Sequence, residues 1–529
     1  MEFSCTDGDG LTYVTRQLCY VCDRIDRVYL SKQALTDLCC ISPEFPLPHS
    51  PATTQTTHAS ATVNNDSPCS CPTRPASPPP LPTGLPPGIN IDQADSVARL
   101  KEWLLQYYKS TAFNTCEHQQ LPLMSGSPLE LHMDPQASPV ACHKVVPVPL
   151  HWREQVKADL ERDIRIGVLE RVPDNTPVTW QSRMVITAKA SGEPRRTIDF
   201  QPLNKHSTRQ TFPVDSPFNL ASRVPAGTKK SVCDVWNGYH SVPLHPNHRH
   251  YTAFLTPWGR FRYKVAPQGH MVSGDGFNER YSSITSFFKN VERCVDHSVM
   301  WADNIQDSFT QVCEYLDLCA RNGVILNPKK FQFCQDVVNF AGLQITDTNV
   351  RPSEKLLQSI REFPTPQDIT GARAWFGLVN QAAYAFAMTE EMACFRHLLK
   401  PKVKFEWTEE LDKLFIKSKQ AIIDKIIEGV HLFDPTLTTC LATDFSGTGL
   451  GFFLLQKTCS CNSRLPTCCP TGWRVCLVGS RFLHPAETRY APIEGEALAV
   501  AYGLHQCRYF ILGCKDLIVA TDHKPLIHV

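Results

Sequence analysis

This sequence has almost no excess charge of either sign and no long apolar run. Its 53 Lys and Arg residues balance 52 Asp and Glu residues, a formal net charge of +1 over 529 residues. A nucleic acid would therefore have to be held by basic residues gathered in one groove. No apolar run reaches the roughly 18–20 residues that span a bilayer, and the amino terminus lacks the basic and apolar segments of a leader. We expect an intracellular protein, cytoplasmic or nuclear, without a membrane partner.

The cysteines do not indicate a disulfide framework. There are 23 of them, an odd number and well below the roughly 8–10% that marks a disulfide scaffold. Inside a cell such residues are mostly thiols and occasionally metal ligands. One group comprises Cys459, Cys461, Cys468 and Cys469. Because its spacing is not that of a familiar zinc knuckle, we favour reduced loop cysteines over a zinc site.

Composition divides the chain into an amino-terminal part with little core-forming sequence and a long continuous part. Proline, serine and threonine dominate residues 46–90, which predicts a linker with polyproline II character. Residues 91–146 contain one amphipathic pattern, typical of a helix, within a loop-rich connecting region. Strand and helix patterns alternate over 147–347, helical patterns dominate 348–432, and strand patterns return from 433. The chain is therefore expected to form several α+β domains.

Two aspartates follow short apolar runs. Asp234 ends SVCD, and Asp296 lies between two apolar arms in VERCVDHSVMW, which predicts a hairpin with the acid at its tip. If the fold brings them together, the pair could hold the two divalent cations that nucleotidyl transfer requires. An aspartate at a strand end is more often a turn or cap residue, so both interpretations stay open on pattern alone.

Three further acids occur in a pattern of three strands, a helix and a fourth strand. Asp444 lies on the first strand, Glu496 on the helix and Asp522 after the last strand. Such a set could also hold two metal ions. The alternative is that the aspartates are turn residues and that Glu496 only complements the helix dipole, a role that Glu494 fits better.

Six blocks of sequence resemble, in order and spacing, the motifs of reverse transcriptases of gypsy-type LTR retrotransposons. They are RRTIDFQPLN, CDVWNGYHSVPL, FLTPWGRFRYKVAPQG, CVDH, NGVILNPKKFQF and NFAGLQIT. The resemblance runs from about residue 147 to the carboxyl end. It implies right-hand polymerase fingers and palm at 147–347, a thumb and connection at 348–432, and a truncated ribonuclease H-like α/β domain at 433–529.

The resemblance also implies an activity and roles for single residues. The activity is RNA-directed DNA polymerization, in which dNTPs extend a DNA primer on an RNA or DNA template with two Mg²⁺ or Mn²⁺ ions per active site. The implied catalytic and metal-binding residues are Asp234 and Asp296 in the polymerase and Asp444, Glu496 and Asp522 in the ribonuclease H. The implied nucleotide-binding residues are Lys189, Arg195, Tyr239, Gln268, Gly269 and Lys330. Taken singly, each of these could instead be a strand-end charge, a core aromatic, a turn residue or a surface lysine.

The sequence departs from the family pattern at the predicted hairpin. His297 stands where the family has a second aspartate, and imidazole is a poor ligand for a hard cation such as Mg²⁺. Asp303 follows on the descending strand, where we do not expect it to reach the tip. A nucleic-acid-binding relic without catalysis is therefore the alternative to an active polymerase.

Two further expectations concern the flanks of the resemblance. The family's ribonuclease H pattern continues past the position of Val529 with a helix, a strand and a helix that carries a fourth aspartate, so we expect little or no hydrolysis. Residues 1–45 resemble the end of a retropepsin region but lack an Asp-Thr/Ser-Gly triplet, so we predict no protease activity. The run WGRFRYK fits either a groove that follows a nucleic-acid backbone or an edge strand with solvated charges.

Overall fold

The computed structural model describes residues 2–6, 12–16, 73–75, 77–189, 191–400 and 403–528, and the chain forms two compact units, 1–68 and 69–529. The described part of the first unit is an antiparallel hairpin of β1 (Glu2–Thr6) and β2 (Thr12–Arg16). The other predictions for residues 1–45, and those for 46–72 of the linker, fall outside the described residues. None of the described helices is long and apolar enough to cross a membrane.

The segments RMVITAK and RRTIDF pair as antiparallel strands in a five-stranded sheet. The strand order is β3-β8-β7-β4-β5, with β3 (Leu169–Arg171), β4 (Ser182–Ala188), β5 (Pro194–Asp199), β7 (Phe254–Thr256) and β8 (Gly259–Tyr263). The helices before it are η1 (Leu150–Trp152) and α3 (Arg153–Arg165).

The basic aromatic run WGRFRYK contributes β8, which has a neighbouring strand on each side. Arg262 pairs with Glu170 at 2.6 Å, and Arg260 donates to the carbonyl of Thr176 at 2.9 Å. The edge-strand interpretation of this run is therefore wrong, because the strand is internal and these two arginines are bound by protein acceptors.

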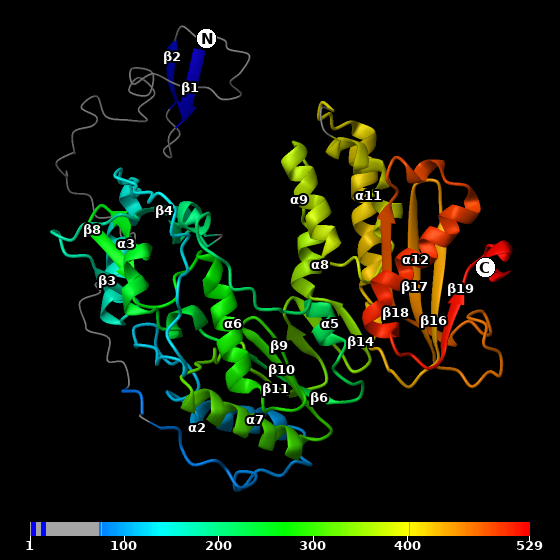
Figure 1. The fold of residues 1–529 in the computed structure, drawn as a ribbon, viewed down its shortest axis with the longest axis horizontal. Helices are drawn as coiled ribbons and strands as arrows, with labels where there is room; N and C mark the ends of the chain where they lie inside the picture. Colours follow the sequence, from blue (N-terminus) through cyan, green and yellow to red (C-terminus); the bar gives the residue numbers. More distant parts are fainter. Residues whose placement is uncertain are drawn as a thin grey trace. The chain divides into compact units, whose positions relative to one another are not determined.

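A four-stranded sheet follows, flanked by α6 and α7 (Figure 1). Its order is β11-β6-β10-β9, with β6 (Lys229–Asp234), β9 (Val291–Cys294), β10 (His297–Ala302) and β11 (Gln332–Gln335). The accompanying helices are α4 (Gln201–Asn204), α5 (Pro217–Ala221), η2 (Gly238–Ser241), η3 (Pro246–Thr252), α6 (Met271–Thr285) and α7 (Ile305–Arg321). After its first residue β6 is buried throughout, as expected of a strand with neighbours on both sides. The hairpin predicted around Asp296 is confirmed, because β9 pairs with β10.

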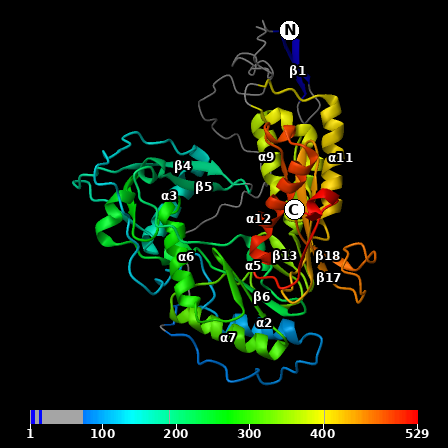
Figure 2. The same ribbon diagram turned by 45° about the vertical axis from the view of Figure 1, so that its right-hand side comes forward.

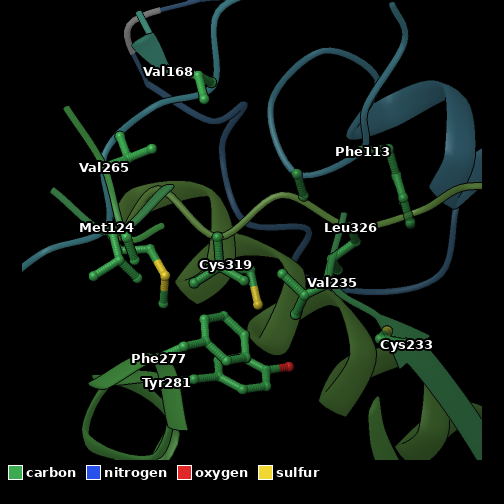
Figure 3. Packing of buried hydrophobic residues seen from close by; sticks show 14 of the residues in the cluster. Phe113, Met124, Val168, Cys233, Val235, Val265, Phe277, Tyr281, Cys319 and Leu326 are labelled. Carbon is green, nitrogen blue, oxygen red and sulfur yellow. The ribbon is translucent and has the colours of Figure 1, made fainter. Parts of the chain in front are cut away.

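Side chains from α6, α7 and β6 form the core under this sheet. Phe277 and Tyr281 of α6 lie beside Cys319 of α7, with Cys233 and Val235 nearby from the end of β6 (Figure 3). The rings of Phe277 and Tyr281 stack at 5.6 Å. All five side chains are almost fully buried, so the sheet that carries the aspartates rests on a close-packed support.

The predicted connecting region packs onto this same core. Its helix, α2 (Ser96–Tyr107), lies against α7, where the ring of Trp103 is 5.7 Å from that of Phe309. The Tyr108 hydroxyl donates to the carbonyl of Cys313 at 3.1 Å. The helix is therefore part of the core that lies under the four-stranded sheet.

A second small sheet and a group of helices follow. The sheet order is β12-β13-β14-β15, with β12 (Val338–Phe340), β13 (Leu343–Ile345), β14 (Asn349–Pro352) and β15 (Val430–His431). The helices are α8 (Glu354–Arg361), α9 (Ile369–Asn380), α10 (Met388–Met392), η4 (Ala393–Leu399) and α11 (Glu409–Ile426). Helix α9 ends at Asn380. The chain turns there, and Tyr384 stacks on Phe218 with ring centroids 4.5 Å apart.

The carboxyl-terminal domain has the predicted order of three strands, a helix and a fourth strand. Its sheet order is β18-β17-β16-β19, with β16 (Thr439–Phe445), β17 (Gly449–Lys457), β18 (Trp473–Phe482) and β19 (Leu517–Ala520). Its helices are η5 (Glu487–Arg489), α12 (Pro492–Ile511) and η6 (Lys524–His528). Helix α12 crosses one face of this sheet (Figures 1 and 2). Strands β16 and β19 run parallel, with Ala442 opposite Ala520.

Candidate active sites

The first two aspartates meet where β6, β10 and the β9–β10 turn come together. Asp234, the last residue of β6, is opposite His297, the first residue of β10, and Asp296 lies in the turn just before it. The Val235 N–H donates to the Asp296 carbonyl at 2.8 Å, which ties the turn to the end of β6. Val295 has a φ of +55°, a left-handed conformation that is costly for a β-branched residue and is often found at functional sites.

A pocket of about 340 Å³ opens beside these aspartates. Its lining comprises Asp234, Val235, Trp236, Asn237, Gly238, Tyr239, Gln268, Phe277, Val295, Asp296, Asn327 and Lys330. The Tyr239 ring meets that of Phe277 edge-on, with centroids 5.6 Å apart. A Cβ at Gly238 would lie 2.4 Å from the Phe277 ring, so glycine is needed for this close approach. Burial, with the charges of Asp296 and Asp275, raises the pKa of Tyr239, which stays a neutral phenol.

His297 bridges the two carboxylates. Its Nδ1 lies 2.9 Å from Oδ1 of Asp296, and its Nε2 lies 3.1 Å from Oδ2 of Asp234. The Asp296 hydrogen bond and the charges of both aspartates raise the pKa of His297 against the opposing effect of burial. Burial alone would raise the pKa of Asp296, but His297, with help from Lys330, holds it below its ordinary value. The imidazole is therefore stabilised in its cationic form between the two carboxylates.

Lys330 makes a second contact to the same acid. Its Nζ lies 2.8 Å from Oδ2 of Asp234, the oxygen that also faces His297. The loop that carries it is fixed to β6, because the Asn327 N–H donates to the Asp234 carbonyl at 2.8 Å. Asp234 is almost fully buried, so these two cations compensate its charge.

The structure brings some of the predicted nucleotide-binding residues to this pocket and leaves others apart. Tyr239, Gln268 and Lys330 line it. Gly269 is not among the lining residues; it follows Gln268 and has a φ of +93°, a conformation that favours glycine. Lys189 and Arg195 lie at the tip of the β4–β5 hairpin and are not among the lining residues. Lys189 there pairs with Glu193 at 3.1 Å.

Some pocket residues had not been predicted. Asn327 and Phe277 both line the pocket, and the sequence signal for Asn327 was its place three residues before Lys330 in NGVILNPKKF. Asp303 follows the far end of β10, as expected, because that end pairs with Lys229 at the start of β6.

The second centre contains Asp444, Glu496 and Asp522. One oxygen from each lies within 4.8 Å of the others. The parallel register of β16 and β19 explains this, since Asp444 and Asp522 each follow the paired alanines by two residues. Glu496 reaches them from α12. The helix can approach this closely only because residue 495 is glycine, since a Cβ there would lie 2.2 Å from the Phe445 ring.

Glu496 is buried, and its backbone hydrogen bond with Phe445 only partly offsets the effect of burial on its carboxylate. Burial and the charges of Asp522 and Asp444 raise its pKa, and its Oε2 has no hydrogen-bond partner among the described residues. Glu494 is different, because its carboxylate accepts the Ala491 N–H at 2.9 Å and caps α12. The three convergent carboxylates of this second centre, with the unpartnered Oε2 of Glu496, fit divalent cations. The first centre differs, because there His297 lies between the two acids.

Two family models match the parts of the chain that hold these centres. One, described as "Reverse transcriptase (RNA-dependent DNA polymerase)", matches residues 189–345, and another, "RNase H-like domain found in reverse transcriptase", matches residues 434–529. The chain carries a reverse transcriptase domain and a ribonuclease H-like domain. These matched segments lie within the predicted domains at 147–347 and 433–529, whose boundaries remain predictions.

Relatives of these two domains are transposon polyproteins. The chain is 24% identical over 391 residues to the retrovirus-related Pol polyprotein from transposon 412 of Drosophila melanogaster, a match that covers 71% of this chain and 30% of that protein. It is 22% identical over 392 residues to the transposon Tf2-7 polyprotein of Schizosaccharomyces pombe (strain 972 / ATCC 24843), covering 72% and 28%. The chain thus spans under a third of the length of these curated relatives.

Solved structures share the fold of the reverse transcriptase and ribonuclease H-like domains. The foamy viral protease-reverse transcriptase in complex with RNA/DNA hybrid matches with a TM-score of 0.70 at 15% identity, covering 84% of this chain and 59% of that one. Its dRH form in complex with dsDNA matches at 0.69 and 16%, covering 84% and 74%. The predicted palm, fingers and thumb followed by a ribonuclease H-like domain are therefore confirmed.

Replacing Glu496 by glutamine should stabilise the ribonuclease H-like domain in the absence of metal. The change removes a buried charge that faces two other acids, so we expect a gain of about 1 kcal/mol in the free energy of unfolding. Thermal unfolding without divalent ions measures this gain. Added Mg²⁺ should then raise the melting temperature of the original chain but not that of the variant.

Glu494→Gln is the matched control. It lies on the same helix and loses only a capping carboxylate, so its melting temperature should stay level or fall slightly. A lower melting temperature for Glu496→Gln would show that this carboxylate has a stabilising partner.

Proposed function

We propose that this chain binds primer–template nucleic acid and extends a DNA primer from dNTPs by metal-dependent nucleotidyl transfer, on an RNA or DNA template. The observation that carries the proposal is the meeting of Asp234 and Asp296 at one pocket, with Tyr239, Gln268 and Lys330 in its lining. The structural neighbours solved with RNA/DNA hybrid and with dsDNA support a nucleic-acid partner for the same fold.

The pocket residues would share the work of the reaction. Divalent ions held by Asp234 and Asp296 would activate the primer hydroxyl and neutralise the leaving pyrophosphate. Lys330 supplies a cation beside the pocket for phosphate oxygens, and it keeps Asp234 oriented. The Tyr239 ring, held edge-on by Phe277, would close the pocket against the sugar of the incoming nucleotide. Lys189 and Arg195, on the hairpin of the five-stranded sheet, would approach the triphosphate from the fingers.

His297 favours a second candidate function, binding of primer–template without chemistry. Its ring nitrogens contact both carboxylates and supply the positive charge that a metal ion would otherwise supply. A centre whose negative charge is already neutralised binds a cation less strongly, and imidazole is a poor ligand for Mg²⁺. The activity of the unaltered chain should therefore be slow.

Primer extension with the full chain distinguishes the two functions. A labelled DNA primer on an RNA or DNA template is incubated with the chain and dNTPs, first in Mg²⁺ and then in Mn²⁺. Extension that Asp234→Asn abolishes and Asp303→Asn leaves intact supports the polymerase, since Asp303 lies beyond the other end of the same sheet. Salt-sensitive binding without extension supports the second function, and absence of binding contradicts both.

Replacing Tyr239 by alanine should relax the selection of the nucleotide sugar. In a His297→Asp background, which we expect to extend primers readily, incorporation of ribonucleotides relative to deoxyribonucleotides should rise at least about tenfold, equivalent to ~1.4 kcal/mol of lost discrimination. Single-nucleotide incorporation kinetics measure the ratio. Tyr239→Phe keeps the ring and should keep the selectivity, and an unchanged ratio in Tyr239→Ala would remove Tyr239 from this role.

A further inference from the structure

The segment between β17 and β18 is a long loop of the ribonuclease H-like domain. It leaves the end of β17 at Lys457 and returns at Trp473, forming neither helix nor strand (Figure 2). Loops of this length without secondary structure are uncommon in compact domains and need another source of order. Apolar packing does not supply it, because Leu465 in this loop is 66% exposed.

Four cysteine sulfurs meet inside this loop. The Sγ atoms of Cys459, Cys461, Cys468 and Cys469 all lie within 4.8 Å of one another, and all four cysteines are unbridged. Cys459 and Cys468 are 3.5 Å apart, and Cys468 and Cys469 are 4.0 Å apart. A tetrahedral zinc ion with Zn–S bonds of about 2.3 Å places its sulfur ligands roughly 3.8 Å apart. The two measured distances lie on either side of this value.

The backbone is shaped to leave room for these sulfurs. A Cβ at Gly472 would lie 2.5 Å from Sγ of Cys469 and 2.7 Å from Sγ of Cys459, so any other residue there would intrude on the cluster. The Thr458 N–H donates to the Gly472 carbonyl at 2.8 Å, and the Gly472 N–H donates to the Cys469 carbonyl at 3.3 Å. The two ends of the loop are therefore closed around the sulfurs.

The loop also reaches across to the fourth strand. Arg464 forms an ion pair with Asp516, just before β19, and Asp516 accepts the Thr438 hydroxyl at 2.7 Å. Fixing the loop would therefore help to hold β19 beside β16. The Nζ of Lys457 donates to the Cys461 carbonyl, which brings one positive charge next to four potential thiolates.

We propose that Cys459, Cys461, Cys468 and Cys469 bind one structural zinc ion that fixes this loop. The site is separate from the carboxylate centre, because Asp444 pairs with Gly451 near the start of β17 whereas the loop leaves from its end. Four sulfur ligands leave no open position for substrate, as in structural zinc sites. The spacing in the sequence did not favour zinc, whereas the folded positions of the sulfurs and the space left by Gly472 do.

The zinc content of the full chain tests the proposal. The protein is purified with reductant and without chelator, supplied with ZnCl₂ and dialysed, and its metal is measured by mass spectrometry. We expect about one zinc ion per chain and a decrease of at least about tenfold in the Cys468→Ser/Cys469→Ser variant. Cys514→Ser is the matched control, a half-buried thiol of the same domain outside the cluster, and should keep its zinc.

A spectroscopic measurement covers the case in which the double variant fails to fold. Co²⁺ added to the metal-free original chain should give the visible absorption of tetrahedral thiolate cobalt, and one equivalent of Zn²⁺ should bleach it. Each of three results would overturn the proposal. They are a zinc-free chain with four freely titratable thiols, a disulfide within the cluster under reductant, and zinc retained by the double variant.

Discussion

Replacing His297 by aspartate should raise Mg²⁺-dependent primer extension by roughly 10²–10³-fold, because a metal clamp on the reacting oxygens contributes several kcal/mol and each 1.4 kcal/mol is tenfold in rate. In the unaltered chain the imidazole contacts both Asp234 and Asp296, which leaves the centre with less negative charge for a hard cation. The substitution removes this bridge and adds a third carboxylate. Steady-state primer extension on both templates measures the change.

Two variants control this prediction. His297→Asp combined with Asp234→Asn should be inactive, because the double variant lacks the buried carboxylate at the end of β6 that we propose as a metal ligand. His297→Asn removes the bridge without adding charge, so its gain should be much smaller than that of His297→Asp. If the unaltered chain already extends primers as fast as His297→Asp, the imidazole is tolerated at this centre and our account of it is wrong.

Replacing Trp375 by alanine should destabilise the helical region between the two domains by about 3–5 kcal/mol. Trp375 of α9 is 1% exposed, and its ring lies 5.3 Å from that of Phe363 and 5.0 Å from that of Phe415. Alanine would leave a cavity where the indole ring now packs between Phe363 and Phe415. Because a chain with several domains need not unfold in one step, hydrogen exchange of α9 and α11 amides is the suitable measurement.

Trp375→Phe is the informative companion. The indole Nε1 of Trp375 is buried and has no hydrogen-bond partner among the described residues, so phenylalanine removes an unsatisfied donor while keeping a ring. We expect a cost within about 1.5 kcal/mol. Equal losses for alanine and phenylalanine would mean that the indole ring itself, and not the filled volume, holds this core.

The sequence was sufficient to predict a structural feature wherever the local pattern and the tertiary structure favour the same conformation. Apolar arms around Asp296 predicted the hairpin, and the short apolar run that ends at Asp234 indicated a strand. Glu494 was expected to complement α12 at its first turn, and the structure makes it the capping residue. These features depend on periodicity and on helix-end chemistry, which can be read locally.

Other features depend on contacts between distant residues. His297 was expected only to be a poor ligand, and the bridge it makes follows from the register of β6 with β10. The end of α9 depends on the stacking of Tyr384 against Phe218, far away in the sequence. The cysteine group could not be judged from spacing, because a loop without regular structure has no periodicity from which sulfur positions follow.

The parallel pairing of β16 with β19 has a consequence for how the ribonuclease H-like domain folds. Asp444 lies on β16 and Asp522 lies two residues after β19, so Ala442 and Ala520 must be in register before these acids can meet. Closing so long a segment of chain is entropically costly and makes the step slow. During synthesis β16 must therefore wait until β19 has left the ribosome. The three carboxylates then converge only after β16 and β19 have paired, so metal binding there reports the formation of this parallel pair.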